Sequence, residues 1–175
     1  MSLLSLDSRW RALQDKGGVY DIGFDAPDDW EHASWRDVEG ADVQVGGDRL
    51  TPDLCKIGAD HFIRATLPLA IRGADDAFAF GLWVLVSRDA FLGYIDGFSS
   101  GNFSHINELD SVICNDLPGF DADEPYACTL IAPTTSDARP GLKLTDPTPL
   151  QDAQDNGLSL DQLLKIYAEA DSDPA

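Results

Sequence analysis

The stretch from Asp53 to Ile95 constrains the fold most, because most of the strongly apolar sequence of the chain lies within it. Residues 61–71 and residues 77–86 each alternate between two sets of side chains, as the two faces of a strand do. The segment between them, residues 72–76, contains the Gly and Asp residues that favour turns. The pattern therefore predicts an antiparallel hairpin, with a shorter strand at residues 53–57 before it.

One face of this hairpin is almost wholly aliphatic and aromatic. A face of that kind is typical of a strand that helices or a second sheet cover. We therefore expect the core to be built on eight residues of this face: Ile63, Leu67, Leu69, Phe78, Phe80, Leu82, Val84 and Val86.

The opposite face of the hairpin carries two residues that differ from their neighbours. Arg64 interrupts an otherwise apolar strand, and arginine is rarely buried without a partner. Trp83 is the one large residue among the small residues of its face. If the two apolar faces lie together, Arg64 and Trp83 fall on the same opposite side. The register of the hairpin then decides whether the guanidinium stacks on the indole.

Helix signals lie on both sides of the hairpin. Residues 1–18 form an N-terminal helical segment in this interpretation, which Gly17 and Gly18 end. Ser87 is placed to cap a helix that contains Tyr94.

The C-terminal part of the chain has the clearest helix boundaries. Thr148 and Pro149 are typical of a helix start and Gly157 of its end. Ser159 and Gln162 form a capping box for a second helix. Residues 171–175 are expected to be a frayed tail, and the second helix should turn four side chains inward: Leu160, Leu163, Leu164 and Tyr167.

The remaining segments are short strands and loops. Strands are expected at 111–115, 127–132 and 141–145, and loops at 38–50, with an edge pair at 43–45, and at 97–104. Strands followed by helices favour the α+β class. We therefore expect residues 1–175 to form a single α+β domain, with a mainly antiparallel sheet of about five strands and flanking helices.

The charge of the chain excludes some partners. Twelve Lys and Arg residues stand against 31 Asp and Glu residues, which gives a formal net charge of −19. Nucleic acid and anionic membranes need clustered cationic side chains, so we expect neither. A basic protein partner is compatible with this charge, although acidic residues also serve solubility alone.

The cysteines and the first residues bear on the compartment. Cys55, Cys114 and Cys128 are odd in number and have no close spacing, which argues for a reducing environment. Residues 1–7 have no basic segment of a signal peptide, and no apolar run approaches the roughly 20 residues of a membrane span. The expectation is a soluble cytoplasmic protein.

The central motifs resemble a known family. They are Asp53-Leu-Cys55, Phe62-Ile-Arg64, Phe80-Gly-Leu-Trp-Val84, Ser87 and Phe91, with Arg139-Pro140 and the segment 149–157 later in the chain. From about residue 20 onward the sequence is similar to the bacterial family DUF2199, a domain of unknown function. The resemblance implies a compact α+β bacterial protein with no assigned activity. Many relatives begin with a Cys-x-x-Cys segment suggestive of zinc, and this sequence has no cysteine before Cys55, so no metal is carried over.

No established catalytic motif is present, so catalytic residues stay unknown and no cofactor is predicted. Five residues could in principle bind zinc, namely Cys55, His61, His105, Cys114 and Cys128, but their spacing is scattered. Buried free thiols are the better interpretation, and we predict no metal. The acidic clusters lack the spaced ligands of a calcium loop.

Two classes of function remain. One is a non-catalytic binding or interaction protein, whose acidic surface would meet a basic partner. The other is a small-molecule-binding protein or enzyme with a cleft beside the hairpin of residues 60–86. In that case Arg64 would supply hydrogen-bond donors to an anion or carbonyl, Trp83 a flat wall and Cys55 a nearby edge. The structural alternative is that Arg64 ties down a neighbouring loop through Asp53.

Overall fold

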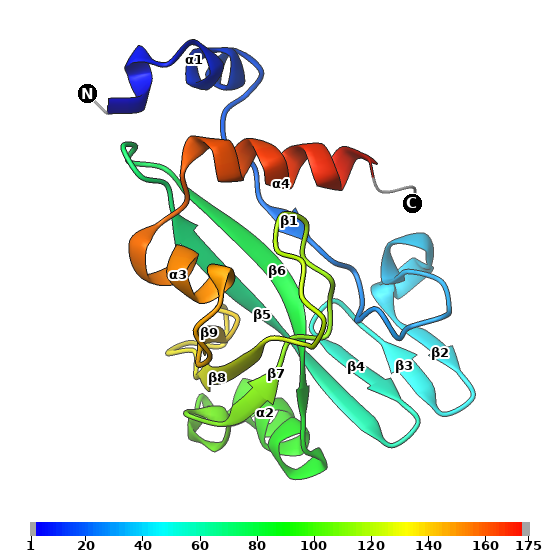
Figure 1. Ribbon diagram of the computed structural model, residues 1–175. Coiled ribbons are helices and arrows are strands. Elements are labelled where there is room, and N and C mark those ends of the chain that lie inside the picture. The colour runs from blue at the N-terminus through cyan, green and yellow to red at the C-terminus, as the bar shows by residue number, and fades with distance from the viewer. Residues whose placement is uncertain (1–2, 173–175) are drawn as a thin grey trace.

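The computed structural model describes residues 3–172, and its centre is a long antiparallel hairpin. The strands β5 (Asp60–Ala70) and β6 (Ala77–Val86) run through the middle of the molecule (Figure 1). They pair continuously from His61 opposite Val86 to Ala70 opposite Ala77. The predicted hairpin is therefore confirmed.

Six shorter strands extend the sheet from the free edge of β5. On one side lie β4 (Leu54–Ile57), β3 (Asp48–Leu50) and β2 (Val43–Val45), all antiparallel. On the other lie β9 (Gly141–Leu144), β8 (Ala127–Ile131) and β7 (Asp110–Val112).

The expected mainly antiparallel sheet of about five strands was wrong in number, and the sheet found is partly parallel. The described residues contain nine strands, and two of the pairings are parallel, between β9 and β5 and between β1 (Ile22–Gly23) and β6. The extra strands are two or three residues long, which is too short to establish an alternating pattern. Parallel pairing joins segments that are distant in sequence, so no local sequence pattern predicts it.

The sheet divides at the middle of β5. Because β6 occupies one edge of β5 along its length, β4 and β9 must share the other edge. The last partner of β4 is Ile63, and β9 joins at Thr66. Arg64 lies between these two points, where its backbone N–H donates to the carbonyl of Asp53 at 3.1 Å.

Four α-helices surround the sheet in the described part of the chain. They are α1 (Ser8–Asp15), α2 (Arg88–Ser100), α3 (Pro149–Asn156) and α4 (Leu160–Ser172). Four short 3-10 helices accompany them, η1 (Leu3–Leu6), η2 (Trp35–Asp37), η3 (Glu39–Ala41) and η4 (Ser104–Ile106). None of the helices within residues 3–172 combines the length and the apolar character that a membrane crossing needs.

Two predicted segments differ from what is found. The helix α2 continues to Ser100, so the loop expected from residue 97 begins only at Gly101. Residues 43–50 form the β2–β3 hairpin rather than a loop with an isolated edge pair. Of the expected tail, residues 171 and 172 are helical in α4, and residues 173–175 lie outside the described part of the chain, as do residues 1–2.

The core consists of two clusters, one on each face of the hairpin. The larger includes all eight predicted residues, although Val86 is only half-buried. The smaller cluster contains Val43, Leu50, Cys55, Phe62 and Trp83. The face that carries Arg64 and Trp83 is therefore packed near β4, beneath residues 24–38, and partly open only from Thr66 onward.

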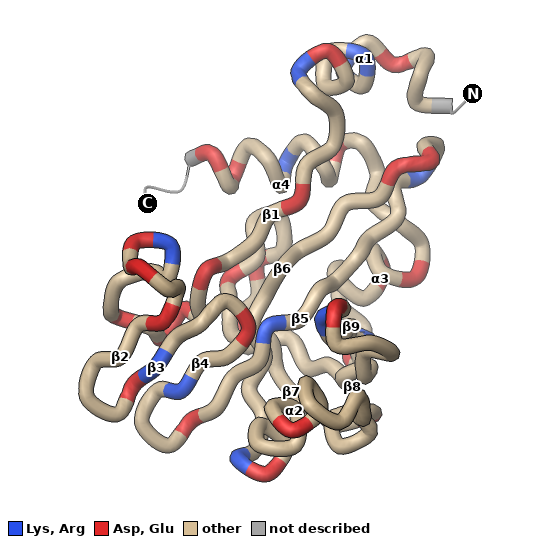
Figure 2. Tube along the Cα trace, turned by 180° about the vertical axis from the view of Figure 1, so that it is seen from behind, with Lys and Arg blue, Asp and Glu red and all other residues tan. Residues whose placement is uncertain are grey.

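Acidic positions are spread over loops and helices all around the tube in Figure 2. They do not gather over one face of the sheet. The net charge of −19 thus surrounds the molecule and does not by itself mark a binding surface.

Candidate functional site

Arg64 and Trp83 are direct register partners across the hairpin, so they do meet as strand neighbours. Their side chains have different surroundings. Trp83 is fully buried and its indole N–H donates to the carbonyl of Phe24 at 2.8 Å. The cation–π contact found in the described residues joins Arg36 to Trp35 instead, at 4.4 Å. Trp83 thus forms part of the floor beside Arg64 rather than a stacking surface for it.

The guanidinium of Arg64 is buried with almost no partner. The residue is 6% exposed. Nη1 donates to the carbonyl of Pro52 at a long 3.4 Å, and the buried Nε has no hydrogen-bond partner. Among residues 3–172, no ion pair joins Arg64 to a carboxylate. Burial lowers the pKa of this guanidinium, and the nearby charge of Arg139 acts in the same direction.

The sequence suggested that the Arg64 side chain ties down a loop through Asp53. Instead, the two residues are joined by the hydrogen bond from the Arg64 backbone N–H to the Asp53 carbonyl. The Asp53 carboxylate pairs with Nε of Arg139 at 2.8 Å. Buried arginine normally has its charge compensated, because an uncompensated buried charge costs several kcal/mol. Arg64 departs from that rule.

Two glycines make the space in which the guanidinium lies. A Cβ at Gly23 would come within 2.7 Å of Nη2 of Arg64, and one at Gly81 within 3.3 Å of the same atom. Gly23 belongs to β1 and Gly81 to β6, and these residues pair with each other. The cation therefore rests over two adjacent strands that both lack side chains at that point.

The surroundings of Arg64 are locally cationic. Two ion pairs flank it, Arg36 with Asp25 at 2.7 Å and Arg139 with Asp53 at 2.8 Å, and all four residues act on it electrostatically. Three guanidinium groups and two carboxylates leave one positive charge, in a chain whose net charge is −19. An anion at this point would meet attraction that most of the molecule does not offer.

A hollow of about 380 Å³ opens where the sheet divides. Its walls come from the turn before β4, from β5 and α2, and from the loop before β9. The lining is mostly polar: Asp53, Thr66, Tyr94, Phe98, Ser136, Asp137, Ala138 and Arg139. Asp53 and Arg139 connect it to the electrostatic surroundings of Arg64. We call this cavity the division hollow.

Cys55 lies away from the hollow, in the smaller core cluster opposite Phe62. It is 1% exposed, and burial raises the pKa of its thiol to about 12. A thiol that stays protonated at neutral pH is a poor nucleophile. His61 is buried beside Phe91, with ring centroids 4.9 Å apart.

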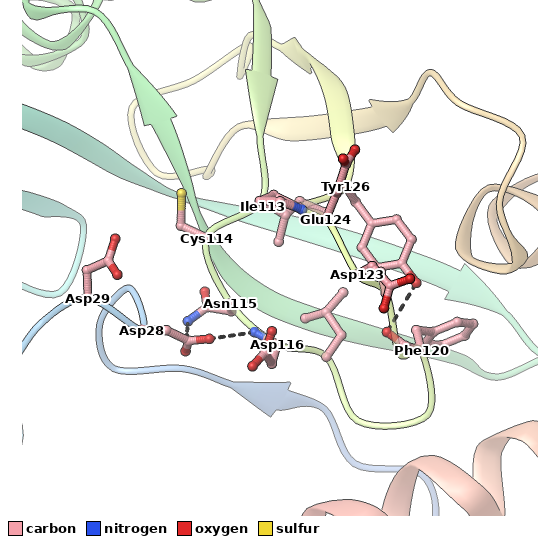
Figure 3. A pocket seen from close by; sticks show the side chains of 13 residues that line it. Asp28, Asp29, Ile113, Cys114, Asn115, Asp116, Phe120, Asp123, Glu124 and Tyr126 are labelled. Carbon is pink, nitrogen blue, oxygen red and sulfur yellow. Dashed lines mark hydrogen bonds between the residues drawn. The ribbon is translucent and has the colours of Figure 1, made fainter.

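A second cavity, the acidic cleft, lies between residues 28–29 and the segment 113–126 and measures about 340 Å³. Its lining includes five carboxylates: Asp28, Asp29, Asp116, Asp123 and Glu124. Figure 3 shows Asp28 accepting hydrogen bonds from the Asn115 side chain and the Asp116 backbone. Asn115 in turn accepts from the backbone N–H of Trp83 at 2.8 Å. Asp28 is thus a structural group, and the other four carboxylates line the cleft.

The scattered thiols and histidines do not form a metal centre. Within residues 3–172 no group of three or more His, Cys, Asp or Glu side chains is arranged to hold a metal ion. All three cysteines are free.

Sequence reasoning missed Gly23, Gly81 and Arg139 as surroundings of Arg64, and Thr66 and Tyr94 as lining of the division hollow. Tyr94 was expected only as part of a helix. Arg139 stood out only through the Arg139-Pro140 motif. Arg139 is brought there by the parallel joining of β9 to β5, and Gly23 by the parallel pairing of β1 with β6. Neither pairing has a local sequence signal.

One family model matches the chain. Its description is "Uncharacterized protein conserved in bacteria (DUF2199)", and it covers residues 14–158. No curated protein and no solved structure matches the chain.

Proposed function

The chain belongs to the DUF2199 family of bacterial proteins. For this member of the family we propose a binding function, in which the ligand is a small organic anion held by Arg64. Trp83 supports Arg64 from the paired strand, and Cys55 packs the edge of the same face. The role is binding rather than catalysis.

The observation that carries this proposal is the unpartnered guanidinium. Arg64 is 6% exposed, Nε has no partner, and no carboxylate among the described residues forms an ion pair with the guanidinium. A planar guanidinium presents five donors in a fork that fits a carboxylate or phosphate. A bound anion would remove the cost of burying this cation, which a structural role for Arg64 leaves unexplained.

The first test measures thermal stability with citrate, succinate, phosphate or gluconate, against sodium chloride of equal ionic strength. A ligand at a hundredfold excess over its Kd stabilises a protein by about 2.7 kcal/mol. For a chain of this size that corresponds to a rise in Tm of roughly 5–11 °C. We expect at least one of these anions to produce such a rise, and Arg64→Met to abolish it.

Two variants sharpen the test. Arg64→Lys keeps the charge and loses the fork, so it should retain only part of the effect. Arg49→Lys is the matched control, because Arg49 is an exposed arginine paired with Asp42. The proposal is wrong if no anion acts more strongly than chloride, or if Arg64→Met responds as the unaltered protein does.

A basic protein partner is the second candidate. The acidic cleft favours it, because Asp29, Asp116, Asp123 and Glu124 are exposed along its wall. Four carboxylates in one hollow would attract lysine and arginine side chains of a partner.

A further inference from the structure

We infer that the division hollow receives the hydroxyl-bearing part of the ligand whose anionic group Arg64 binds, so that the ligand is a sugar or polyol that carries a carboxylate or a phosphate. This inference rests on the proposed function of Arg64 and adds the chemical class of the ligand.

The hollow lies within reach of a ligand bound at Arg64. Thr66 lines the hollow and is two residues beyond Arg64 on the same strand, so the two Cα atoms are separated by about 6.6 Å. Asp53 also lines it, and the backbone carbonyl of Asp53 accepts the N–H of Arg64. Asp53 and Arg139, which both line the hollow, also act electrostatically on Arg64.

Tyr94 supplies an observation independent of Arg64. The residue is 1% exposed and lines the hollow, yet its hydroxyl has no hydrogen bond within residues 3–172. Its ring packs against Phe98 and Phe103, with centroids 5.0 and 5.7 Å away. Within residues 3–172 the buried side-chain polar atom without a partner is Nε of Arg64, so the Tyr94 hydroxyl is open to the hollow, where a ligand hydroxyl can bond it. Asp53 and Arg139 line the same hollow as Tyr94, and their charges act on its hydroxyl.

The lining mixes donors with acceptors. Arg139 donates, Asp53 and Asp137 accept, and the hydroxyls of Thr66, Ser136 and Tyr94 do both. A ligand hydroxyl also donates and accepts, so a chain or ring of hydroxyls can satisfy both kinds of group. A bare anion would face Asp53 and Asp137, and a bare amine would face Arg139 and the charge of Arg64.

The size and the one aromatic wall agree with this class. About 380 Å³ falls near the lower end of the range for small-molecule pockets. Phe98 is 40% exposed and lines the hollow, and it offers an apolar surface to the C–H groups of a sugar. The remaining walls are polar, which disfavours a fatty acid.

The experiment compares two acids that share a six-carbon chain and differ in their hydroxyls, gluconate and hexanoate, by calorimetric titration of the full chain. Glucose 6-phosphate and inorganic phosphate form the corresponding phosphate pair. We expect the hydroxylated member of at least one pair to bind at least tenfold more tightly than its partner.

Tyr94→Phe removes only the hydroxyl. It should weaken binding of the hydroxylated probe by roughly 2- to 13-fold, the value of one net hydrogen bond, and leave hexanoate or inorganic phosphate unchanged. Tyr20→Phe is the matched control, because Tyr20 is a half-exposed tyrosine outside the hollow.

The outcomes separate the two proposals. If anions bind through Arg64 but hydroxylated probes bind no more tightly, or if Tyr94→Phe affects no probe, the inference is overturned and the anion site stands. If no anion binds at all, the proposed function fails and the inference fails with it.

Discussion

At the scale of single residues, Arg64 is the group whose role is easiest to test through stability. If Arg64 ties down a loop, its removal should lower the free energy of unfolding. If Arg64 is held for a ligand, it should destabilise the ligand-free protein, because its charge is buried with one long hydrogen bond. Replacing buried ionic groups with apolar side chains of similar size has stabilised other proteins by about 1–4 kcal/mol.

We therefore expect Arg64→Met to raise the free energy of unfolding of the ligand-free protein, by about 1 kcal/mol or more. Urea unfolding in a buffer without organic anions measures it. The control is Arg139→Met, which breaks the ion pair with Asp53 and should not stabilise. A loss of stability in Arg64→Met would identify a structural tie instead.

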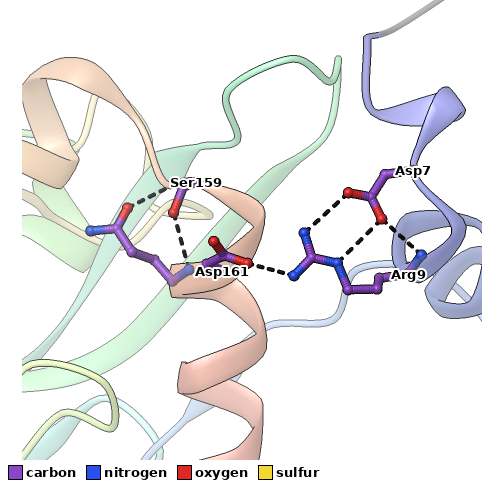
Figure 4. A network of polar contacts seen from close by, with 5 residues as sticks. Asp7, Arg9, Ser159 and Asp161 are labelled. Carbon is purple, nitrogen blue, oxygen red and sulfur yellow. Dashed lines mark hydrogen bonds and ion pairs between the residues drawn. The ribbon is translucent and has the colours of Figure 1, made fainter.

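At the scale of elements, capping residues defined the helix starts. Ser87 accepts from the N–H of Ala90, and Thr148 from that of Gln151, as predicted. Figure 4 shows the reciprocal bonds of Ser159 and Gln162 at the start of α4. Beside them Arg9 pairs with Asp7, the N-cap of α1, and with Asp161, which joins α1 to α4. The helix α4 buries Leu160, Leu163 and Tyr167 as expected, and Leu164 is half-buried.

The helix α2 contains a glycine where its packing leaves no room. A Cβ at Gly97 would lie 2.4 Å from Cδ1 of Phe103. In an exposed helix, alanine would gain about 1 kcal/mol over glycine. Here the clash should outweigh that gain, and we expect Gly97→Ala to destabilise the protein by about 1–3 kcal/mol in denaturant unfolding.

Adding Phe103→Leu should recover part of that loss, because the two residues are in contact and their effects should not add. If Gly97→Ala stabilises the protein by itself, Phe103 yields easily and the close packing of α2 does not explain the glycine.

At the scale of the whole molecule, a net charge of −19 attracts any basic peptide weakly and without specificity. Binding alone is therefore not informative, and the experiment must locate it. We expect an octalysine peptide to bind at low salt and to be released as salt screens the charges. Asp123→Asn with Glu124→Gln removes two charges from the acidic cleft. This double variant should weaken binding more than Asp75→Asn with Asp76→Asn, which removes two exposed charges from the β5–β6 turn. Equal weakening in a titration would mean that the cleft has no special affinity and that a basic partner does not dock there.

The sequence by itself determined the features that depend on local periodicity and local hydrogen bonds. The central hairpin, its apolar face, the helix caps and the side shared by Arg64 and Trp83 all follow from side-chain alternation and capping chemistry. These interactions join residues that are close in the chain, so the local sequence is enough to predict them.

Only the tertiary structure decided what surrounds Arg64. The parallel addition of β9 brings Arg139 to Asp53, α2 brings Tyr94 to the same hollow, and β1 lays Gly23 against Gly81. Each of these contacts joins segments far apart in sequence, through strands of two to four residues or through a helix whose face is chosen by packing. Local sequence patterns do not predict such long-range contacts, and the candidate site consists almost entirely of these contacts.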